Sequence, residues 1–212
     1  MTLTLYTNPK SRGRIVRWML EECGAEYDVE VLEYGSTMHA ESYRRINPMA
    51  KVPAIVHDDQ IVTECAAICT YLADAFPDAG LAPPVDRRGA YYRWLFFAAG
   101  PLESAIVNQA LGVTPSPEQQ TFVGYGSLQR VLDAVEQALG DNPWIAGDRF
   151  SAADVYVGSQ VAFGLQFKTI EARPVFSDYC DRLSSRDARR RANALDDQLV
   201  AAADGNDGGS GT

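Results

Sequence analysis

The chain has 212 residues, of which 46% are hydrophobic and 22% charged, and its formal net charge is −9. This composition is typical of an ordinary globular protein with one large or two small domains. The net negative charge argues against a nucleic-acid partner, and we interpret the one basic run, Arg189–Arg191, as a solvated helix face. No apolar run reaches the ~18–20 residues of a membrane span, and the N-terminus has no secretion-signal pattern. We therefore expect a cytoplasmic protein that does not bind membranes.

The cysteines and histidines offer little metal or disulfide chemistry. The four cysteines form no CxxC pair and no metal-ligand spacing, and the chain has only two histidines. In the absence of a secretion signal, an even number of cysteines is weak support for disulfides. We predict reduced thiols and no metal site.

The first part of the chain alternates between strand-like and helix-like patterns. Short apolar runs with period-two alternation indicate strands, and apolar stripes with helical spacing indicate helices. The resulting β-α-β-α-β-β-α order predicts a small α/β unit. The expected strands are 3–6, 27–31, 53–56 and 60–63, and the expected helices are 12–23, 38–45 and 65–76.

A segment rich in proline, glycine and alanine follows, and it predicts a domain boundary. We expect residues 1–77 to form one domain, 78–86 a linker, 87–202 an all-helical domain and 203–212 a disordered tail. In the second domain, "SAAD" at 151–154 is a capping-box pattern that begins a helix. The other expected helices are 87–111 with a bend at Gly100-Pro101, 112–139, and two that Pro174 and Ser185 flank.

Within "KVPAI", Pro53 lies at the start of an apolar strand, where a residue without an N–H is unusual. A cis Val52–Pro53 bond would turn the N–H and C=O of Val52 toward solvent, where they could pair with a peptide-like ligand as an added strand does. A trans proline at a plain strand start explains "KVPAI" alone better. The next segment reverses that preference.

Glu64 and Cys65 lie at the expected turn between the last strand and the helix 65–76. Free N–H groups and the positive end of the helix dipole favour a ligand carboxylate there, and Glu64 could accept from an ammonium group. Together with the backbone groups of Val52, this arrangement predicts a site for a small peptide with a free α-amino-acid end.

The sequence resembles the cytosolic glutathione transferase family over its whole length except the tail. The resemblance is carried by "LYTNPKSRGRIVRWMLEE", "NPMAKVPAIV", "TECAAICTYL" and "DRFSAADV". It implies a thioredoxin-like α/β N-terminal domain followed by an all-α C-terminal domain, glutathione as cosubstrate without a metal, and a homodimer. It is most similar to bacterial members that use a serine near the first helix.

The resemblance implies an enzyme of detoxification that conjugates the glutathione thiolate to small hydrophobic electrophiles. Another glutathione-dependent activity (isomerase, dehalogenase, ether cleavage or peroxidase) and a non-catalytic interaction protein of the same fold remain open. The absence of cysteine at positions 11 and 12 disfavours mixed-disulfide chemistry.

Ser11 takes the place of the thiol-activating hydroxyl in the serine-type members, and a role as a helix cap is its alternative. Two rivals for thiol activation are Arg12, whose alternative is an ordinary surface role, and Tyr6, for which packing is the better explanation.

The resemblance also implies residues that hold glutathione: Val52 and Pro53 by the backbone, Glu64 and Cys65 at the γ-glutamyl end, and Lys51 and His39 at the glycyl carboxylate. His39 could equally be an exposed helix residue. Cys65 departs from the family, whose members generally have serine there. Because a thiol is a weaker donor, we expect weaker glutathione binding, unless Cys65 is simply a small core residue.

Overall fold

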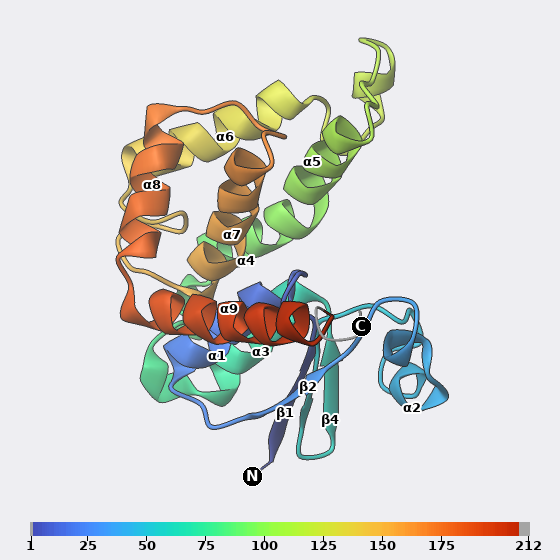
Figure 1. Ribbon diagram of the computed structural model, residues 1–212. Coiled ribbons are helices and arrows are strands. Elements are labelled where there is room, and N and C mark those ends of the chain that lie inside the picture. The colour runs from blue at the N-terminus through green and yellow to red at the C-terminus, as the bar shows by residue number, and fades with distance from the viewer. Residues whose placement is uncertain (1, 208–212) are drawn as a thin grey trace. The chain divides into compact units, whose positions relative to one another are not determined.

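The computed structural model describes residues 2–207 of the chain. The chain divides into two compact units, Met1–Ala79 with Ser185–Thr212 and Gly80–Ser184. The first unit contains the β-sheet, and the second is built from helices (Figure 1). The last helix, which the sequence analysis assigned to the region 87–202, belongs to the first unit by its contacts.

The first unit is organised around one sheet with the strand order β2-β1-β3-β4. Strand β1 pairs parallel with β2 and antiparallel with β3, and β3 pairs antiparallel with β4. The apolar alternation places Leu3 and Leu5 of β1 in the core. The predicted thioredoxin-like α/β fold is confirmed. The strands are β1 (Leu3–Thr7), β2 (Asp28–Val31), β3 (Ala54–His57) and β4 (Gln60–Thr63).

The two helices predicted from apolar stripes, over 12–23 and 65–76, are present with those stripes buried. Helix α1 buries Ile15 and Met19 on one side, and Gly24 ends it in the left-handed conformation (φ 62°) that glycine adopts without strain. The expected helix 38–45 is divided in two, because Ala40 is extended between the 3₁₀ turn Thr37–His39 and α2. The helices are α1 (Gly13–Cys23), α2 (Glu41–Arg44), α3 (Cys65–Ala75) and α9 (Asp187–Asp207).

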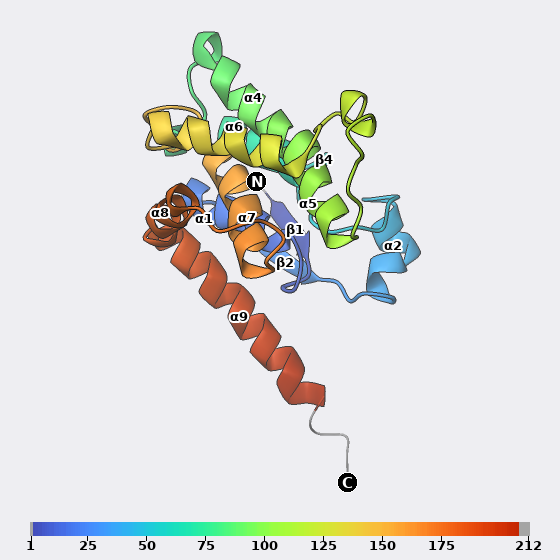
Figure 2. The same cartoon turned by 90° about the horizontal axis from the view of Figure 1, so that it is seen from above.

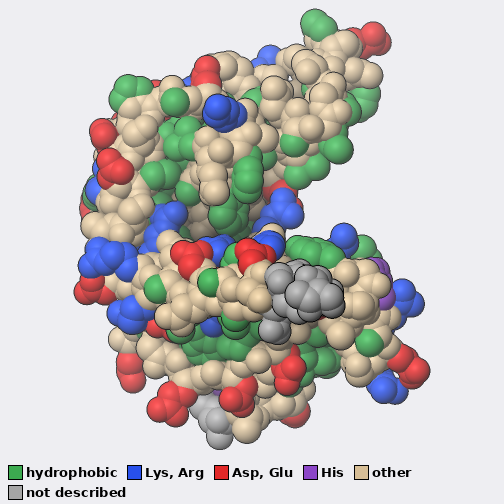
Figure 3. All heavy atoms as spheres, viewed as in Figure 1, with side chains coloured by type: hydrophobic (Ala, Val, Ile, Leu, Met, Phe, Trp, Pro, Cys, Tyr) green, Lys and Arg blue, Asp and Glu red, His purple; other side chains and the backbone are tan. Residues whose placement is uncertain are grey.

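Helix α9 packs along α1 through a series of charged contacts. The central pair, Arg17 and Asp196, is buried, and Arg186 holds Glu22 through two hydrogen bonds of 2.6 and 2.7 Å. Three more ion pairs join the start of the chain or α1 to α9, namely Lys10–Asp204, Arg14–Asp197 and Glu21–Arg191. Figure 3 shows acidic and basic side chains gathered along α9.

These contacts also change the interpretation of the basic run Arg189–Arg191. The guanidinium of Arg189 lies over the ring of Trp18 at 4.7 Å, and Arg191 pairs with Glu21. Part of the run therefore holds α1 instead of only facing solvent. The C-terminal segment 203–212 was expected to be disordered; α9 continues through Asp207, and 208–212 lie outside the described residues.

In the second unit, helix α7 is buried over most of its length. Its side chains Val155, Val157 and Val161 are fully enclosed, as expected for a helix that is apolar on all sides. The predicted all-α architecture is confirmed. The helices are α4 (Gly89–Phe97), α5 (Glu103–Ala110), α6 (Leu128–Asp141), α7 (Ala152–Gln166) and α8 (Pro174–Ser184).

Helices α4 and α5 form one continuous run that a π-helical turn, Ala98–Leu102, interrupts (Figure 2). Pro101 lies inside this turn. Because proline has no N–H and its ring clashes with the preceding turn, the wider π turn accommodates it. The predicted irregularity at Gly100-Pro101 is therefore present.

The helix expected over 112–139 is shorter than the sequence suggested. Helix α6 begins at Leu128, where the Ser127 side chain accepts a hydrogen bond from the Arg130 N–H at 3.3 Å. Gly126 before it has φ 66°, which a helix does not allow. The segment before it contains only a short 3₁₀ turn, Gln119–Thr121.

The capping box at the start of α7 forms as predicted. Asp154 accepts from the Ser151 N–H at 2.9 Å, and also from the Ile145 N–H and the Tyr179 hydroxyl. Burial raises the pKa of the Asp154 carboxyl to about 6, although these hydrogen bonds oppose the rise.

Among the described residues, no helix is both long and apolar enough to cross a membrane.

Candidate active site

The pairing of the sheet brings three loops to one edge. Tyr6 of β1 lies opposite Ala54 of β3, and Ala54 lies opposite Thr63 of β4. Strand β1 ends, β3 begins and β4 ends at this row, because both pairings are antiparallel. The loops 8–12, 51–53 and 64–65 therefore leave the sheet at the same edge, and they carry most of the site residues predicted from the sequence.

A direct contact joins the first and third of these loops. The Cys65 thiol, at the first residue of α3, donates to the Arg12 carbonyl with a sulfur–oxygen distance of 3.8 Å. Cys65 is buried, and its thiol is turned toward the start of α1. The starts of α1 and α3 are thus held next to each other, so Ser11 lies close to the first turn of α3.

The second loop presents the backbone of Val52. The Val52–Pro53 bond is cis, as the sequence analysis expected. The carbonyl of the preceding Lys51 accepts from the Tyr43 hydroxyl at 2.5 Å and from the Asn47 side chain at 2.8 Å. By contrast, the N–H and C=O of Val52 have no hydrogen-bond partner within residues 2–207. This pair of groups is available to an extended ligand.

The start of α3 completes the edge. Ile68 makes the first closed hydrogen bond, to the Glu64 carbonyl at 2.8 Å, and within residues 2–207 the N-cap residue Glu64 makes no side-chain capping hydrogen bond. Such an uncapped N-terminus favours an anion. Glu64 is exposed with φ 68° and ψ 122°, a conformation that costs a non-glycine residue about 1–3 kcal/mol and that occurs mainly at functional sites.

Ser11 is half-buried in the first loop, and its hydroxyl makes two hydrogen bonds. It donates to the Asn8 carbonyl at 2.6 Å and accepts from the Gly13 N–H at 2.9 Å. The second of these bonds satisfies an N–H at the start of α1, so Ser11 acts as a cap in this structure. The Asn8 carbonyl also accepts the Ser11 N–H at 3.0 Å.

The other predicted residues differ in their surroundings. Tyr6 packs on Tyr43 with ring centroids 5.7 Å apart, and burial, followed by the charge of Glu30, raises its pKa. Arg12 and Lys51 have exposed side chains on the first and second loops.

His39 is exposed on the 3₁₀ turn Thr37–His39. Its neighbour Met38 packs into the apolar cluster that Val52 and Tyr6 also contact, which carries the turn close to the site edge. His39 thus lies on a different segment from the three loops.

Two supporting residues were missed by the sequence analysis. The Asn8 side chain donates to the Leu32 carbonyl at 2.8 Å and accepts from the Lys10 N–H, so it shapes the first loop. Asn47 shapes the second loop in the same way through Lys51 and Met49. Both asparagines stand before a proline in "TNPK" and "INPM", a pattern typical of Asx turns that could have revealed them.

A thioredoxin-like sheet with a cis-proline loop and an uncapped helix start, on a chain that also has an all-helical unit, is characteristic of glutathione-binding transferases. The comparisons with known proteins agree. Residues 1–74 match the model of the glutathione S-transferase N-terminal domain, and 118–182 match that of the C-terminal domain.

The chain belongs to the glutathione transferase family. It is 31% identical over 157 residues to glutathione S-transferase GstA of Escherichia coli, covering 70% of this chain and 75% of that protein. It is also 30% identical over 203 residues to a maleylacetoacetate isomerase of Pseudomonas aeruginosa, covering 90% and 95%.

Solved structures show the same fold. A glutathione transferase from Methylococcus capsulatus superposes with a TM-score of 0.77 at 30% identity, covering 93% of this chain and all of that one (100%). A sphingomonad glutathione S-transferase in complex with glutathione superposes with a TM-score of 0.75 at 26% identity, covering 91% and 98%.

Proposed function

We propose that this chain binds glutathione at the three-loop edge and transfers its thiolate to small hydrophobic electrophiles. The observation that carries the proposal is the pair of unpartnered Val52 backbone groups next to the uncapped start of α3. The Val52 pair would hold the cysteinyl part of glutathione as an added strand. The start of α3 would hold the γ-glutamyl carboxylate, and Glu64 would accept from its ammonium group.

Thiol activation is assigned to Ser11. A free thiol has a pKa of ~8.5, and lowering it by about two units requires about 2.7 kcal/mol. A hydrogen bond to a charged acceptor supplies about 1.5–3 kcal/mol, and the start of α1 adds a few tenths. One hydroxyl donor is therefore sufficient without a general base.

To donate to the sulfur, the Ser11 hydroxyl must turn away from the Asn8 carbonyl. That carbonyl keeps the Ser11 N–H as a partner, so it is not left unsatisfied. The Gly13 N–H that Ser11 accepts polarises the hydroxyl and strengthens it as a donor. Both features favour reorientation of the Ser11 hydroxyl from the Asn8 carbonyl toward the sulfur when the thiolate is present.

Arg12 and Tyr6 are the alternatives for this role. Arg12 could stabilise the thiolate by its charge from the start of α1. The pKa of the Tyr6 phenol is raised and its ring is packed on Tyr43, which favours a structural role. Lys51 and His39 are proposed to contact the glycyl carboxylate, since both are exposed near the same edge.

The test combines binding and thiol counting. Calorimetry should show heat with millimolar glutathione, and an electrophile screen should then show product formation with the loss of one free thiol per product. The absence of heat would instead support a non-catalytic protein of the same fold.

Glutathione-dependent isomerisation is the second candidate. It is supported by the 30% identity to a maleylacetoacetate isomerase over 95% of that protein. An isomerase regenerates glutathione, so turnover of maleylacetoacetate with an unchanged amount of free thiol would favour it over conjugation.

We further propose that the protein works in the cytoplasm as a homodimer in detoxification. Tyr92 and Phe96, one turn apart on α4, are 39% and 74% exposed, which is typical of a surface that another subunit covers. Light scattering on the purified chain tests the dimer.

A further inference from the structure

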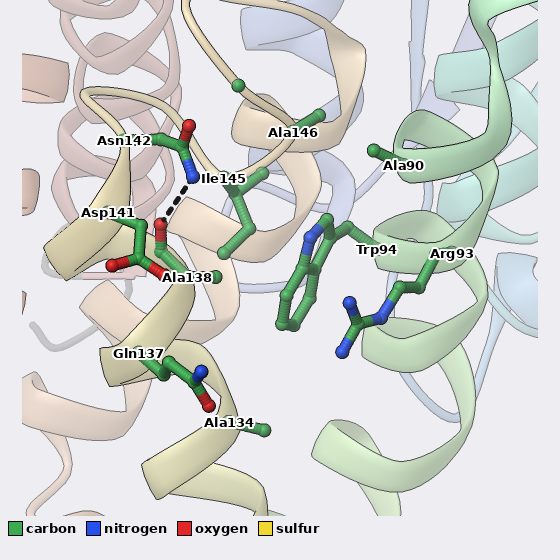
Figure 4. A pocket seen from close by; sticks show the side chains of 11 residues that line it. Ala90, Arg93, Trp94, Ala134, Gln137, Ala138, Asp141, Asn142, Ile145 and Ala146 are labelled. Carbon is green, nitrogen blue, oxygen red and sulfur yellow. Dashed lines mark hydrogen bonds between the residues drawn. The ribbon is translucent and has the colours of Figure 1, made fainter.

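Two pockets of the second unit differ in the surface that they offer to a ligand. The first lies between α4, α6 and the loop 142–147 (Figure 4), and its wall residues Trp94 and Ile145 are only 3% and 1% exposed. It therefore offers little apolar surface. The second has a volume of about 710 Å³, within the about 300–1,000 Å³ typical of small-molecule sites. Every residue that lines it except Tyr125 keeps exposed surface.

The second pocket lies where the π turn Ala98–Leu102 interrupts the run of α4 and α5. This turn and the first part of α5 form one wall, and the segment 123–125 before α6 forms the other. A Cβ built on Gly100 of the first wall or on Gly124 of the second would meet no other part of the chain within 4 Å, so a ligand can approach the backbone of both. Single π turns within α-helices occur frequently at functional sites.

The surface around this pocket is apolar and almost uncharged. Val107 in the wall is 37% exposed, and Leu111 and Phe122, which lie just beyond the lining residues in the chain, are 71% and 76% exposed. From position 104 to position 129 the sequence contains one charged residue, Glu118. Exposed apolar side chains that gather in this way mark a ligand-binding or interaction site.

One hydrogen-bonded pair supplies a polar group to the pocket. The Tyr125 hydroxyl accepts the side-chain N–H of Asn108 at 2.7 Å, and both residues line the pocket. Tyr125 is 8% exposed, and within residues 2–207 its hydroxyl donates to no acceptor. A nearly buried donor without an acceptor is unfavourable, and the Asn108 amide polarises the hydroxyl and strengthens it as a donor. An oxygen atom of a ligand would complete this arrangement.

The charge of the lining selects against anions. Glu103 contributes a carboxylate, and no Lys or Arg is among the described residues that line the pocket. The Tyr156 hydroxyl donates to this carboxylate at 3.0 Å, which holds it at the wall. An anionic ligand would therefore meet a like charge without finding a cation.

We propose that this pocket binds a neutral apolar molecule that carries a carbonyl oxygen. The oxygen accepts the Tyr125 hydroxyl proton, and the apolar body packs on the π turn and on Val107 and Val123. The proposal goes beyond the glutathione site, because all the residues that line this pocket belong to the second unit.

The test is equilibrium dialysis of the full chain with benzophenone and with diphenylmethane, which has the same two rings without the oxygen. Benzophenone is expected to bind saturably. Tyr125→Phe should weaken benzophenone binding about tenfold, the effect of one lost hydrogen bond, and should leave diphenylmethane binding unchanged. 4-Benzoylbenzoate, which adds a carboxylate, should bind about tenfold more weakly than benzophenone.

The matched control is Tyr34→Phe, which removes the hydroxyl of an exposed tyrosine of the first unit. It should bind both compounds like the unchanged chain. A second variant, Val107→Asp, places a charge on the exposed part of the apolar wall and should weaken the binding of both compounds. Circular dichroism checks that each variant is folded.

The position of the ligand can be found without any variant. Under ultraviolet light the bound ketone takes a hydrogen atom from a nearby C–H group, and the two carbons then join, so the whole benzophenone molecule is added to the chain. Mass spectrometry of the digested protein should locate it within 99–108 or 122–125.

The proposal is overturned if benzophenone does not bind, if Tyr125→Phe affects neither compound or both equally, or if the attached molecule lies outside these two segments. Glutathione is absent from these experiments, so such a result would leave the proposed glutathione transfer intact.

Discussion

Arg17 of α1 and Asp196 of α9 form a buried ion pair, with Nε and Oδ1 2.8 Å apart and side chains that are 3% and 0% exposed. The pair lies between the exposed contacts Arg14–Asp197 and Glu21–Arg191. Because α1 begins just after Ser11, the same contact supports the helix from which the proposed thiol activator is presented. Helix α9 thus stabilises the first unit although it follows the helical one in the chain.

We expect Asp196→Ala to lower the free energy of unfolding by about 3–5 kcal/mol, because it leaves the Arg17 charge buried without a partner. The control is Asp197→Ala, whose carboxylate is 67% exposed and pairs with Arg14 near the surface. This second change should cost less than about 1 kcal/mol. Urea denaturation measures both, and equal losses in the two variants would contradict the importance of the buried pair.

Gly13→Ala should be strongly destabilising. A Cβ at Gly13 would lie 1.8 Å from the Thr7 Oγ1, so the start of α1 would have to move away from β1. We expect a loss of about 1–3 kcal/mol in the free energy of unfolding, measured by thermal or urea denaturation.

The matched control for this change is Gly89→Ala in α4, where a Cβ meets no atom within 4 Å. It should be neutral or slightly stabilising, since alanine favours a helix over glycine. Adding Thr7→Ala to the Gly13→Ala chain should recover part of the loss. If it recovers nothing, the clash with Thr7 is not the cause.

Ser11→Ala should raise the pKa of the bound glutathione thiol by about one to two units, because the proposed hydrogen bond to the thiolate is worth about 1.5–3 kcal/mol. Ultraviolet absorbance of the thiolate, followed against pH, gives this value directly. Tyr6→Phe should leave the titration unchanged, since the Tyr6 ring serves packing on Tyr43. An unchanged curve for Ser11→Ala with a shifted one for Arg12→Ala would move the role to Arg12.

Glu64→Gly should separate stability from binding. Glycine tolerates the positive φ of 68° at this position, so the free energy of unfolding should rise by about 1 kcal/mol. Glutathione binding should weaken because the carboxylate proposed to hold the ammonium is lost.

Glu64→Ala is the comparison, because it removes the carboxylate but keeps the strained backbone. It should weaken glutathione binding as much as Glu64→Gly without the gain in stability. Calorimetry and urea denaturation on the two variants give both quantities. Unchanged binding in both would remove Glu64 from the site.

Asp154 predicts a pH dependence of stability. Burial raises the pKa of this carboxyl from 3.8 to about 6 in the folded chain, so the folded state binds the proton more tightly than the unfolded state does. The contribution of this group to stability is then largest below pH 3.8 and is lost as the pH rises toward 6. The slope is at most about 1.4 kcal/mol per pH unit.

The measurement is the difference in the free energy of unfolding between the unchanged chain and Asp154→Asn, taken from pH 4 to pH 7. The unchanged chain should lose stability relative to this variant as the pH rises. Asp148→Asn, at an exposed carboxyl in the preceding loop, should show no such trend. A difference that is flat with pH would contradict the raised pKa.

Much of the fold could be predicted from local patterns. The stripe Ile15–Met19 with Gly24 after it marked α1, and the "SAAD" pattern marked the start of α7 with its capping box. These signals depend on residues a few positions apart, so the sequence carries them directly. The helix expected over 112–139 was too long, because Gly126 with its positive φ and the Ser127 cap were overlooked.

The candidate site could be predicted only as a set of residues. The proline in "KVPAI" and the acidic residue at the start of α3 pointed to two of the loops that leave the sheet at the same edge. The pairing of Tyr6 with Ala54, and of Ala54 with Thr63, is what brings these loops together. The hydrogen-bond partners of the Ser11 hydroxyl could also be found only from the structure, since the positions of Asn8 and Gly13 show that this hydroxyl acts as a cap.

The sequence by itself determined the order of the strands and most helices and the capping box of α7, because each depends on the conformational preferences of neighbouring residues. Only the tertiary structure decided that α9 lies on α1, that Asn108 and Tyr125 line one pocket, and that the Lys51 carbonyl is occupied while the groups of Val52 are not. Such contacts join residues far apart in the chain, as Arg17 and Asp196 do across 179 positions. Packing and charge in the folded chain select which residues pair in this way, and no pattern of neighbouring residues predicts these pairs.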